Sequence, residues 1–356
     1  MSKTRPTLAI LTPAFPTEDQ DTWLPAQAVF VAALNEHFPG LEIIILVFHF
    51  PEVIHKYHEW RGNKVVSFNG GMRGNLHTLW RWRCVWRELG HIRSSGNLIG
   101  IFSFFCSESA FIGHYFARRH RLAHFIWVLG QDARKDNRQV RRIKPQPGEL
   151  IAISDFLVRE FRDSHGIIPA HMIPIGVDPS AAIAFDEPRT IDILGAGTLS
   201  PIKGYDLFVD VVSKITESLP RLKAVICGTG SEEGALQQQI DRLELGDRIQ
   251  LAGGKTHPQM LQTMQRSKIL LHTSSYEGFG MVCVEALCAG AHVISFIKPL
   301  DTEIDHWHTV STADEMIAKA IALLQNPATT YYSVVPYKIE ETARKIMKLF
   351  GYDSEE

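Results

Sequence analysis

The sequence has no long apolar run and no pair of cysteines spaced like the ligands of a zinc site. A membrane-spanning helix needs about 18–20 consecutive apolar residues, and no stretch of the chain reaches that length. Only five cysteines occur, each inside an apolar segment, which predicts reduced thiols in a cytosolic protein. Residues 1–6 are too few and too polar for a secretory signal, so we expect no leader.

The usual nucleotide and metal fingerprints are also missing. The glycine-rich segment 195–204 has neither the G-K-S/T of a P-loop nor the G-x-G-x-x-G of a dinucleotide site. The only D-x-D, Asp19-Gln20-Asp21, follows the first predicted strand, where a solvated loop is a better interpretation than a metal site. We therefore expect no metal ion and no cofactor.

The composition is that of an ordinary globular protein. Hydrophobic residues make up 45% of the 356 and charged residues 21%, which is enough apolar mass for two cores. Residues 1–185 carry 21 Lys and Arg against 16 Asp and Glu, whereas the remainder carries 16 against 23. This uneven charge predicts two domains with different tasks.

Apolar strand-like runs alternate with helical segments in both halves, which predicts an α/β fold with parallel sheets covered on both faces. Strands are expected at 7–12, 43–50, 98–105, 125–129, 150–154, 172–175, 191–194, 223–227, 249–252, 269–273 and 292–296. Helices are expected at 26–38, 76–89, 110–120, 155–164, 205–219, 232–243, 258–266, after Gly280, at 313–325 and at 337–350.

A turn at 176–179 and an aperiodic stretch at 181–189 interrupt this alternation. We predict an N-terminal domain at 1–185, a C-terminal domain at 186–330, and a last segment at 331–356 whose helix packs back on the N-terminal domain. The expected ligand site is a crevice between the two domains, at the carboxyl ends of the strands.

Two carboxylates stand eight positions apart in the segment Tyr276-Glu277-Gly278-Phe279-Gly280-Met281-Val282-Cys283-Val284-Glu285. The segment is typical of a strand end, a glycine turn and a short helix, whose first N–H groups bind phosphate. Glu277 would lie just before the helix and Glu285 about two turns inside it, and each carboxylate can accept two sugar hydroxyls. This fits a nucleotide sugar, although two solvated glutamates beside an ordinary turn would give the same pattern.

Two further glycine turns follow strands of the same predicted sheet. The segment 195–204 carries Lys203 before a helix, which is typical of a diphosphate contact. A simple turn with an exposed lysine would look the same. Gly228-Thr229-Gly230 follows the next strand, so all three turns are expected at one edge of the sheet.

The second half of the chain resembles the retaining glycosyltransferases of family 4. Four segments carry the resemblance, in the order of the family: G-x-L-S-P with K-G, V-I-C-G-T-G-S-E, D-R-I-Q-L-A-G and S-S-Y-E-G-F-G-M-V-C-V-E-A-L-C-A-G. The resemblance covers 191–296 and extends weakly to 151–156 and 173–178. It implies the GT-B fold, two Rossmann-like doubly wound domains facing across a crevice, with the acceptor bound by the first and the nucleotide sugar by the second.

The resemblance also implies residue roles. Glu277 would contact the transferred sugar, Glu285 the nucleotide ribose and Lys203 the diphosphate. The implied donor contacts include Gly197, Thr198, Gly228, Gly278, Phe279, Gly280, Met281 and Val282.

The chain departs from the family pattern at several places. Thr198 stands where the family usually has an arginine that pairs with the lysine, and Arg134 is a candidate to replace it. The first loop, 13–16, lacks the usual glycine pair, and 103–108 lacks the usual histidine. Asp132, or its neighbour Gln131, is expected to face the sugar instead. The donor half therefore looks intact, whereas the acceptor half is divergent.

The first hypothesis is a retaining hexosyltransferase that moves a sugar from a nucleotide-diphosphate sugar to a glycan or lipid-linked acceptor, in cell-surface polysaccharide or glycoconjugate synthesis. Lys203 and the helix start after Gly280 would stabilise charge on the leaving diphosphate, without a metal. The alternatives are a nucleotide-sugar-binding protein without turnover and a nucleotide-sugar epimerase. No nucleic-acid partner is expected.

Residues 76–89 interleave large apolar side chains with arginines, which is typical of an interfacial helix. Packing on the sheet with solvated arginines would give the same pattern. The apolar residues are Leu76, Leu79, Trp80, Trp82, Trp86 and Leu89, and the arginines are Arg81, Arg83 and Arg87. We expect a cytoplasmic protein with peripheral contact at the inner membrane face through its N-terminal domain.

Overall fold

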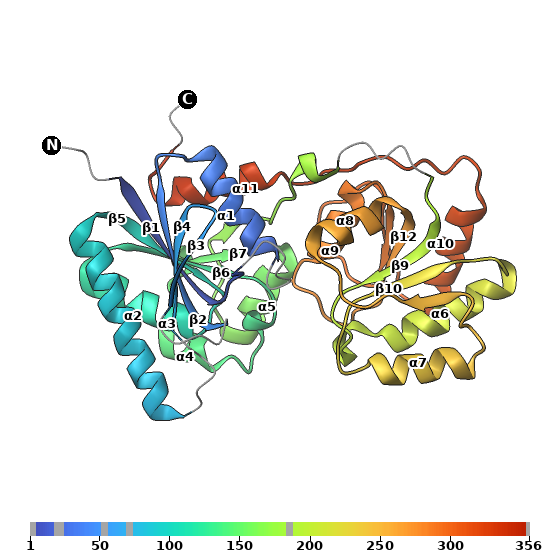
Figure 1. Cartoon of the computed structure of the whole chain (residues 1–356), viewed down its shortest axis with the longest axis horizontal. Coiled ribbons are helices and arrows are strands. Elements are labelled where there is room, and N and C mark those ends of the chain that lie inside the picture. The colour runs from blue at the N-terminus through green and yellow to red at the C-terminus, as the bar shows by residue number, and fades with distance from the viewer. Residues whose placement is uncertain (1–4, 18–24, 51–55, 69–73, 183–187, 354–356) are drawn as a thin grey trace. The chain divides into compact units, whose positions relative to one another are not determined.

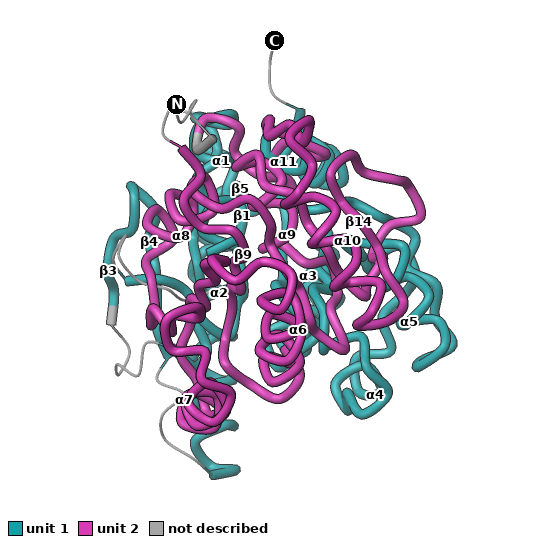
Figure 2. Tube along the Cα trace, turned by 90° about the vertical axis from the view of Figure 1, so that its right-hand side faces the viewer, with its two compact units in different colours: residues 1–175, 339–356 teal, residues 176–338 magenta. Residues whose placement is uncertain are grey.

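The computed structural model describes residues 5–17, 25–50, 56–68, 74–182 and 188–353. The chain forms two compact units, shown in different colours in Figure 2. Unit 1 consists of residues 1–175 and 339–356, and unit 2 of residues 176–338. The division therefore falls after Ile175, whereas the sequence placed it after residue 185, and the last helix belongs to unit 1.

Unit 1 contains an eight-stranded sheet in the order β3-β4-β2-β1-β5-β6-β7-β8. Neighbouring strands pair in parallel except for the antiparallel β3 and β4. The strands are β1 Pro6–Ala14, β2 Glu42–Phe50, β3 Lys56–Trp60, β4 Asn63–Ser67, β5 Asn97–Phe104, β6 Ala123–Val128, β7 Leu150–Ala152 and β8 His171–Met172. The helices are α1 Pro25–His37, α2 Asn75–Ser95, α3 Glu108–His120, α4 Arg138–Ile143, α5 Asp155–His165 and α11 Ile339–Leu349, with short 3-10 turns η1 Gln131–Ala133 and η2 Pro147–Glu149.

Alternate side chains of the central strands serve the two faces of this sheet. Ile101 of β5 belongs to a buried cluster with Val85 and Leu89 of α2. The ring of its neighbour Phe102 lies 5.7 Å from that of Phe30 in α1. Phe350, directly after α11, lies 6.2 Å from Phe102, and α11 packs beside α1 (Figure 1). Helices therefore cover both faces, as the near-continuous apolar strands predict.

Unit 2 contains six parallel strands in the order β11-β10-β9-β12-β13-β14. Counted along the unit, this is the 3-2-1-4-5-6 order of a Rossmann fold, and the order reverses between β9 and β12. The strands are β9 Ile191–Ala196, β10 Ala224–Cys227, β11 Ile249–Leu251, β12 Ser267–His272, β13 His292–Ser295 and β14 Trp307–Thr309. The helices are α6 Tyr205–Ser218, α7 Glu233–Arg242, α8 His257–Gln265, α9 Met281–Cys288 and α10 Ala313–Gln325, with short turns η3 Pro179–Ala182 and η4 Pro201–Lys203.

The two predicted Rossmann-like sheets are confirmed, and α10 has the predicted bounds. Four short strands and helices were missed: β3 and β4, which form a hairpin, α4 and β14. The hairpin and β14 lie at sheet edges, where strands need no continuous apolar run. The segment Asp19-Gln20-Asp21 lies outside the described residues. Among the described residues, no helix has both the length and the hydropathy needed to cross a bilayer.

Candidate functional site

Two of the predicted glycine turns lie against each other at the carboxyl edge of the unit 2 sheet. The N–H of Gly197, after β9, donates to the carbonyl of Cys227, and Leu199 N–H donates to Thr229 O at 2.9 Å. Gly228 has φ +153°, and a Cβ there would lie 1.8 Å from the Gly197 carbonyl oxygen. Only glycine fits this approach, so the loops after β9 and β10 form one packed layer.

The loop that carries Lys203 is fixed to the loop after β12. Thr273 Oγ1 donates to the Lys203 carbonyl at 3.0 Å, and Ser275 N–H donates to Ile202 O at 3.0 Å. Gly204 has φ +62°, and a Cβ there would lie 2.7 Å from the Thr273 carbonyl oxygen. The two loops meet where the strand order reverses, which is the usual ligand position in such sheets.

Lys203 and Glu277 form an ion pair at this point. Lys203 Nζ lies 2.5 Å from Glu277 Oε2, and both side chains are about one quarter exposed, at 24% and 22%. His272, the last residue of β12, places Nε2 3.6 Å from the same oxygen. Burial raises the pKa of Glu277, but the nearby His272 ring and the Lys203 charge outweigh burial and lower this pKa to about 2. Glu277 is therefore an anion at any physiological pH.

Helix α9 begins next to Glu277 with unsatisfied donors. Gly280 is its N-cap, in the left-handed region, and no side chain caps the helix. Within the described chain, no hydrogen-bond acceptor faces the N–H groups of Met281 and Val282. Because these donors coincide with the positive end of the helix dipole, the position is suited to an anion. Gly278 and Phe279, which belong to this turn, are both buried.

Glu285 lies on the same helix, one turn further than the uncapped donors. Its Oε1 is 2.8 Å from Nε2 of His257, the first residue of α8. The hydrogen bond to Glu285 raises the pKa of His257 against the opposing effect of burial. The Glu285 side chain is only 13% exposed, so this contact fixes the direction in which the carboxylate points.

The remaining predicted residues differ in their surroundings. Thr198 is exposed in the loop after β9 and carries no charge that could replace an arginine. Asp132 lies in unit 1, where its carboxylate accepts the N–H groups of Cys106 at 2.8 Å, Leu129 at 3.1 Å and Gly130 at 2.8 Å. Burial raises the pKa of Asp132, an effect that these donors oppose. Asp132 therefore holds the loop after β6 in shape, and its contact with a sugar stays a prediction.

The sequence analysis missed the two histidines that orient the glutamates. His272 ends a predicted strand, and His257 directly precedes a predicted helix. Their positions at the carboxyl edge of the sheet and at a helix start were readable from the pattern. Their partners were not, because His257 lies 28 positions from Glu285 in the sequence.

One group of described side chains could hold a metal ion, and it belongs to unit 1. Ligand atoms of His114, His124 and Glu149 lie within 4.8 Å of one another. His124 Nε2 also lies 2.9 Å from Ser103 Oγ, so a hydrogen bond already engages one of the two ring nitrogens of His124. The residues of the Lys203–Glu277 site belong to unit 2 and include no such group among those described.

Comparisons with known proteins show similarity to glycosyltransferases. Residues 183–350 match the family model described as Glycosyl transferases group 1. The chain is 33% identical over 129 residues to the gpi3 subunit of phosphatidylinositol N-acetylglucosaminyltransferase from Schizosaccharomyces pombe, covering 36% of this chain and 28% of that protein. It is 30% identical over 127 residues to the GtfA subunit of UDP-N-acetylglucosamine–peptide N-acetylglucosaminyltransferase from Streptococcus pneumoniae, covering 36% and 25%. The chain thus matches about a quarter of the length of these relatives.

Solved structures extend the likeness over the whole chain. The pneumococcal O-GlcNAc transferase GtfA, in complex with UDP and GlcNAc, superposes with a TM-score of 0.67 at 13% identity, covering 98% of this chain and 99% of that one. Anabaena HepE, in complex with UDP and glucose, gives 0.65 at 16% identity, covering 97% and 96%. These likenesses confirm the predicted GT-B fold with two Rossmann-like units.

Proposed function

We propose that this chain is a retaining glycosyltransferase that moves a sugar from a nucleotide-diphosphate sugar to a glycan or lipid-linked acceptor. The observation that carries the proposal is the meeting of Lys203, Glu277 and the uncapped start of α9 where the unit 2 strand order reverses. The relatives named above are N-acetylglucosaminyltransferases, and both solved structures contain UDP. UDP-N-acetylglucosamine is therefore the first donor to test.

The donor is expected to span the edge of the sheet. Its diphosphate would accept the N–H groups of Met281 and Val282 and contact Lys203, which would then bridge the phosphate and Glu277. Glu285, held by His257, would accept the two ribose hydroxyls. Gly197 and Gly228 are proposed to contact the donor through their backbone, since the Gly197 carbonyl already fills the space beside the Gly228 Cα. Gly278 and Phe279 form the buried part of the turn that precedes α9.

Cleavage of the bond between the sugar and the diphosphate builds negative charge on the leaving group. Lys203 and the start of α9 would stabilise that charge, and donors aimed in advance at developing charge commonly contribute a few kcal/mol each. These groups are a lysine and backbone amides, so the proposed chemistry needs no metal. The Glu277 carboxylate, held by Lys203 and His272, is suited to accept a sugar hydroxyl, and attack on the same face as departure is proposed.

The acceptor is proposed to be a glycan or a membrane lipid-linked molecule, as in cell-surface polysaccharide or glycoconjugate synthesis. The gpi3 relative is named for a transfer to phosphatidylinositol, and unit 1 carries exposed apolar side chains on α2. We propose that the protein works in the cytoplasm with peripheral contact at the inner membrane face. Asp132 is proposed to face the sugar, and Arg134 to neutralise diphosphate charge in place of the arginine that Thr198 replaces.

The test begins with binding and ends with products. UDP-, GDP-, ADP- and dTDP-sugars are screened by thermal shift, because a bound donor stabilises the folded state by mass action. The donor that binds is then incubated with soluble and lipid-linked acceptors, and the anomeric configuration of the product is read by NMR. A product with the donor's configuration supports the proposal, and an inverted product contradicts the retaining mode.

A second candidate function is nucleotide-sugar binding without turnover. Thr198 in place of an arginine and the full engagement of Asp132 with backbone donors favour it. Saturable donor binding with no transfer and no hydrolysis across the acceptors would support this candidate. Release of free nucleotide with an epimerised sugar would instead support an epimerase.

A further inference from the structure

Helix α2 of unit 1 exposes three large apolar side chains in its first two turns. Leu76 is 83% exposed, Leu79 57% and Trp80 44%. Arg83 and Arg87 continue the same stripe of the helix, because residues three or four positions apart share a face. The sequence also placed Leu89 on the interfacial side, and this is wrong, because Leu89 is fully buried. Exposed apolar side chains clustered in this way mark an interaction surface.

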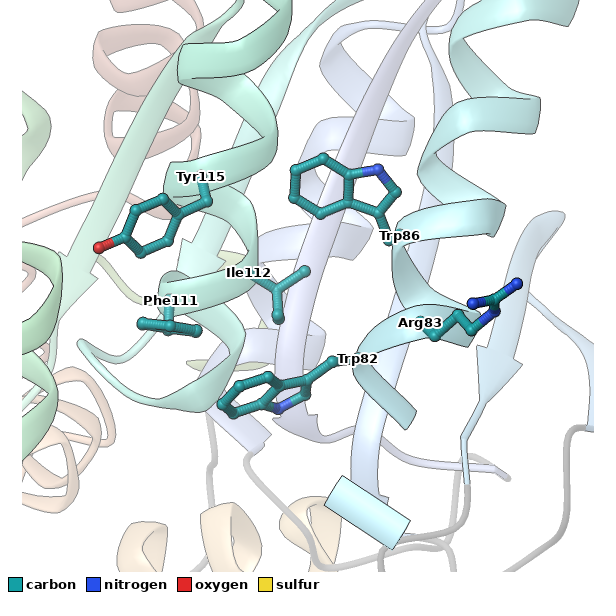
Figure 3. Close-up of a pocket in the computed structure, with 6 residues that line it drawn as sticks. All are labelled: Trp82, Arg83, Trp86, Phe111, Ile112 and Tyr115. Carbon is teal, nitrogen blue, oxygen red and sulfur yellow. The ribbon is translucent and has the colours of Figure 1, made fainter. Parts of the chain in front are cut away.

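An apolar pocket opens beside this stripe, between α2 and α3. It has a volume of about 350 Å³ and is lined by Trp82, Arg83, Trp86, Phe111, Ile112 and Tyr115. Figure 3 shows the rings of Trp82 and Trp86 directed from α2 toward the residues of α3, with Arg83 extending away from them. Trp82 and Trp86 are therefore pocket walls, which agrees with the packed-helix alternative and not with the interfacial one.

Hydrogen bonds and ring contacts hold the side chains that line the pocket in place. Arg81 Nη2 donates to both Glu108 oxygens, at 2.8 and 2.9 Å, and Trp82 Nε1 also donates to Glu108. The Trp82 and Phe111 ring centroids lie 4.9 Å apart, and the Trp86 ring packs 5.0 Å from that of Phe116. The pocket is thus a preformed, open depression with aromatic walls, and such apolar walls suit an apolar ligand.

The charge around the pocket has one sign. Arg83 and Arg87 of α2 and Arg118 and Arg119 of α3 are exposed. The carboxylates of the same helices are already paired, Glu108 with Arg81 and Glu88 with Lys64 at 3.1 Å. The described surface of the two helices therefore presents free positive charge around an apolar centre, which complements an anionic lipid surface.

We propose that α2 and α3 dock unit 1 on an anionic membrane, with Leu76, Leu79 and Trp80 inserted among the acyl chains and one lipid hydrocarbon chain in the α2–α3 pocket. This inference rests on the proposed lipid-linked acceptor, to which it adds the binding surface and the chemical class of its ligand. An apolar chain fits the pocket because its walls offer almost no polar group, and the arginines meet the lipid phosphates at its rim.

Vesicle binding of the full chain tests the docking surface, with no donor or acceptor present. Binding to phosphatidylcholine vesicles containing phosphatidylglycerol is expected to exceed binding to pure phosphatidylcholine, and to weaken as salt is raised. Because each arginine near the surface contributes about fivefold in affinity, R83Q/R87Q should bind about 25-fold more weakly. L79E/W80E should abolish binding, whereas Ile168→Glu, at another exposed apolar residue of unit 1, should not.

Quenching by lipids with brominated acyl chains tests the pocket. Trp86→Phe keeps a ring against Phe116 and removes an indole that the chain would touch, so the quenched fraction of tryptophan emission should fall. Trp60→Phe is the control, since Trp60 is only 4% exposed, and loss of an unquenched indole cannot lower that fraction. An unchanged quenched fraction in Trp86→Phe would overturn the pocket assignment.

Three results separate this inference from the proposed function. Equal recovery of wild type with neutral and anionic vesicles would overturn the docking surface, even if sugar transfer to a soluble acceptor were intact. Dimerisation in solution that L79E/W80E abolishes, without an effect on vesicle binding, would assign the surface to a second copy of the chain. R242Q/R221Q in unit 2 is the charge-matched control, and a loss of vesicle binding equal to that of R83Q/R87Q would also contradict the proposal.

Discussion

Lys203→Met removes the lysine cation paired with Glu277 while keeping most of the length and packing of the lysine. Two unit charges about 4 Å apart interact by about 4 kcal/mol at the effective dielectric constant of a protein surface. Because Lys203 is partly exposed and its charge is partly screened by solvent, we expect the variant to lose about 2.7 kcal/mol of transition-state stabilisation relative to free enzyme and donor. The variant should therefore lose at least about 10²-fold in kcat/KM, with kcat lowered as well.

The same substitution should change the pH dependence. Lys203 and His272 together hold the pKa of Glu277 at about 2, and removal of Lys203 leaves only His272 to oppose the effect of burial. The acid limb of the pH–rate profile should move to higher pH in Lys203→Met, because the Glu277 carboxyl becomes easier to protonate.

The assay is initial-rate measurement of nucleotide release with saturating acceptor, across pH 4 to 9. Lys214→Met is the matched control, since Lys214 lies exposed on α6 and pairs with Glu217 at 2.9 Å. The control should retain wild-type rates. A Lys203→Met enzyme within about threefold of wild type in kcat/KM would refute the assignment of Lys203 to the leaving group.

Three further predictions concern stability and metal dependence. In urea titrations, Gly228→Ala should lower the free energy of unfolding by at least about 2 kcal/mol, because the new Cβ would lie 1.8 Å from the Gly197 carbonyl oxygen. The control Gly246→Ala should be nearly neutral, since a Cβ at Gly246 would have no neighbour within 4 Å. Burial, together with Lys319, His292 and His306, lowers the pKa of His308 to about 4 against the opposing Asp305. As pH falls, the imidazole of His308 therefore binds a proton in the unfolded state before it does so in the folded state. The free energy of unfolding should fall by roughly 1 kcal/mol between about pH 6.5 and 4, after allowance for solvent screening. The same fall should be shallower in His308→Gln. EDTA should leave turnover unchanged, and a loss that manganese or magnesium restores would contradict the metal-free phosphate site.

The repeated alternation of strand and helix was predictable because both sheets are parallel and buried on both faces. Runs such as 8–11 are fully buried and apolar at every position, so they stand out without any knowledge of their neighbours. The β3–β4 hairpin did not stand out, since it lies at the sheet edge and contains polar residues such as Lys64 and Glu59.

The positions of the site residues were predictable to the extent that glycine turns and carboxylates mark loops. Glu277, Glu285 and Lys203 could be placed at the carboxyl edge because each follows or precedes an element with a clear pattern. The residues that pair with them could be identified only from the folded structure. Lys203 and Glu277 are separated by 74 positions, and nothing local in either segment indicates that they pair.

Asp132 shows the opposite limit. The sequence identified a carboxylate at the end of β6, where a sugar contact was reasonable. In the structure, the Asp132 carboxylate accepts hydrogen bonds from three backbone N–H groups, and one of these belongs to Cys106, which is 26 positions away. A residue type at the right edge of a sheet thus indicates a site, but the hydrogen bonds that already occupy it decide its task.

The most direct test of the donor site measures the separate effects of Glu277 and Glu285 on the binding of nucleotide and of sugar. Calorimetric titration of free UDP and of the UDP-sugar that is turned over is done on wild type, Glu277→Gln and Glu285→Gln. Glu285→Gln should weaken the binding of free UDP, because its carboxylate is assigned to the ribose. Glu277→Gln should bind free UDP nearly as wild type does and lose the additional affinity that the sugar provides. The reverse pattern, in which Glu277 controls free UDP binding and Glu285 is silent, would contradict the account.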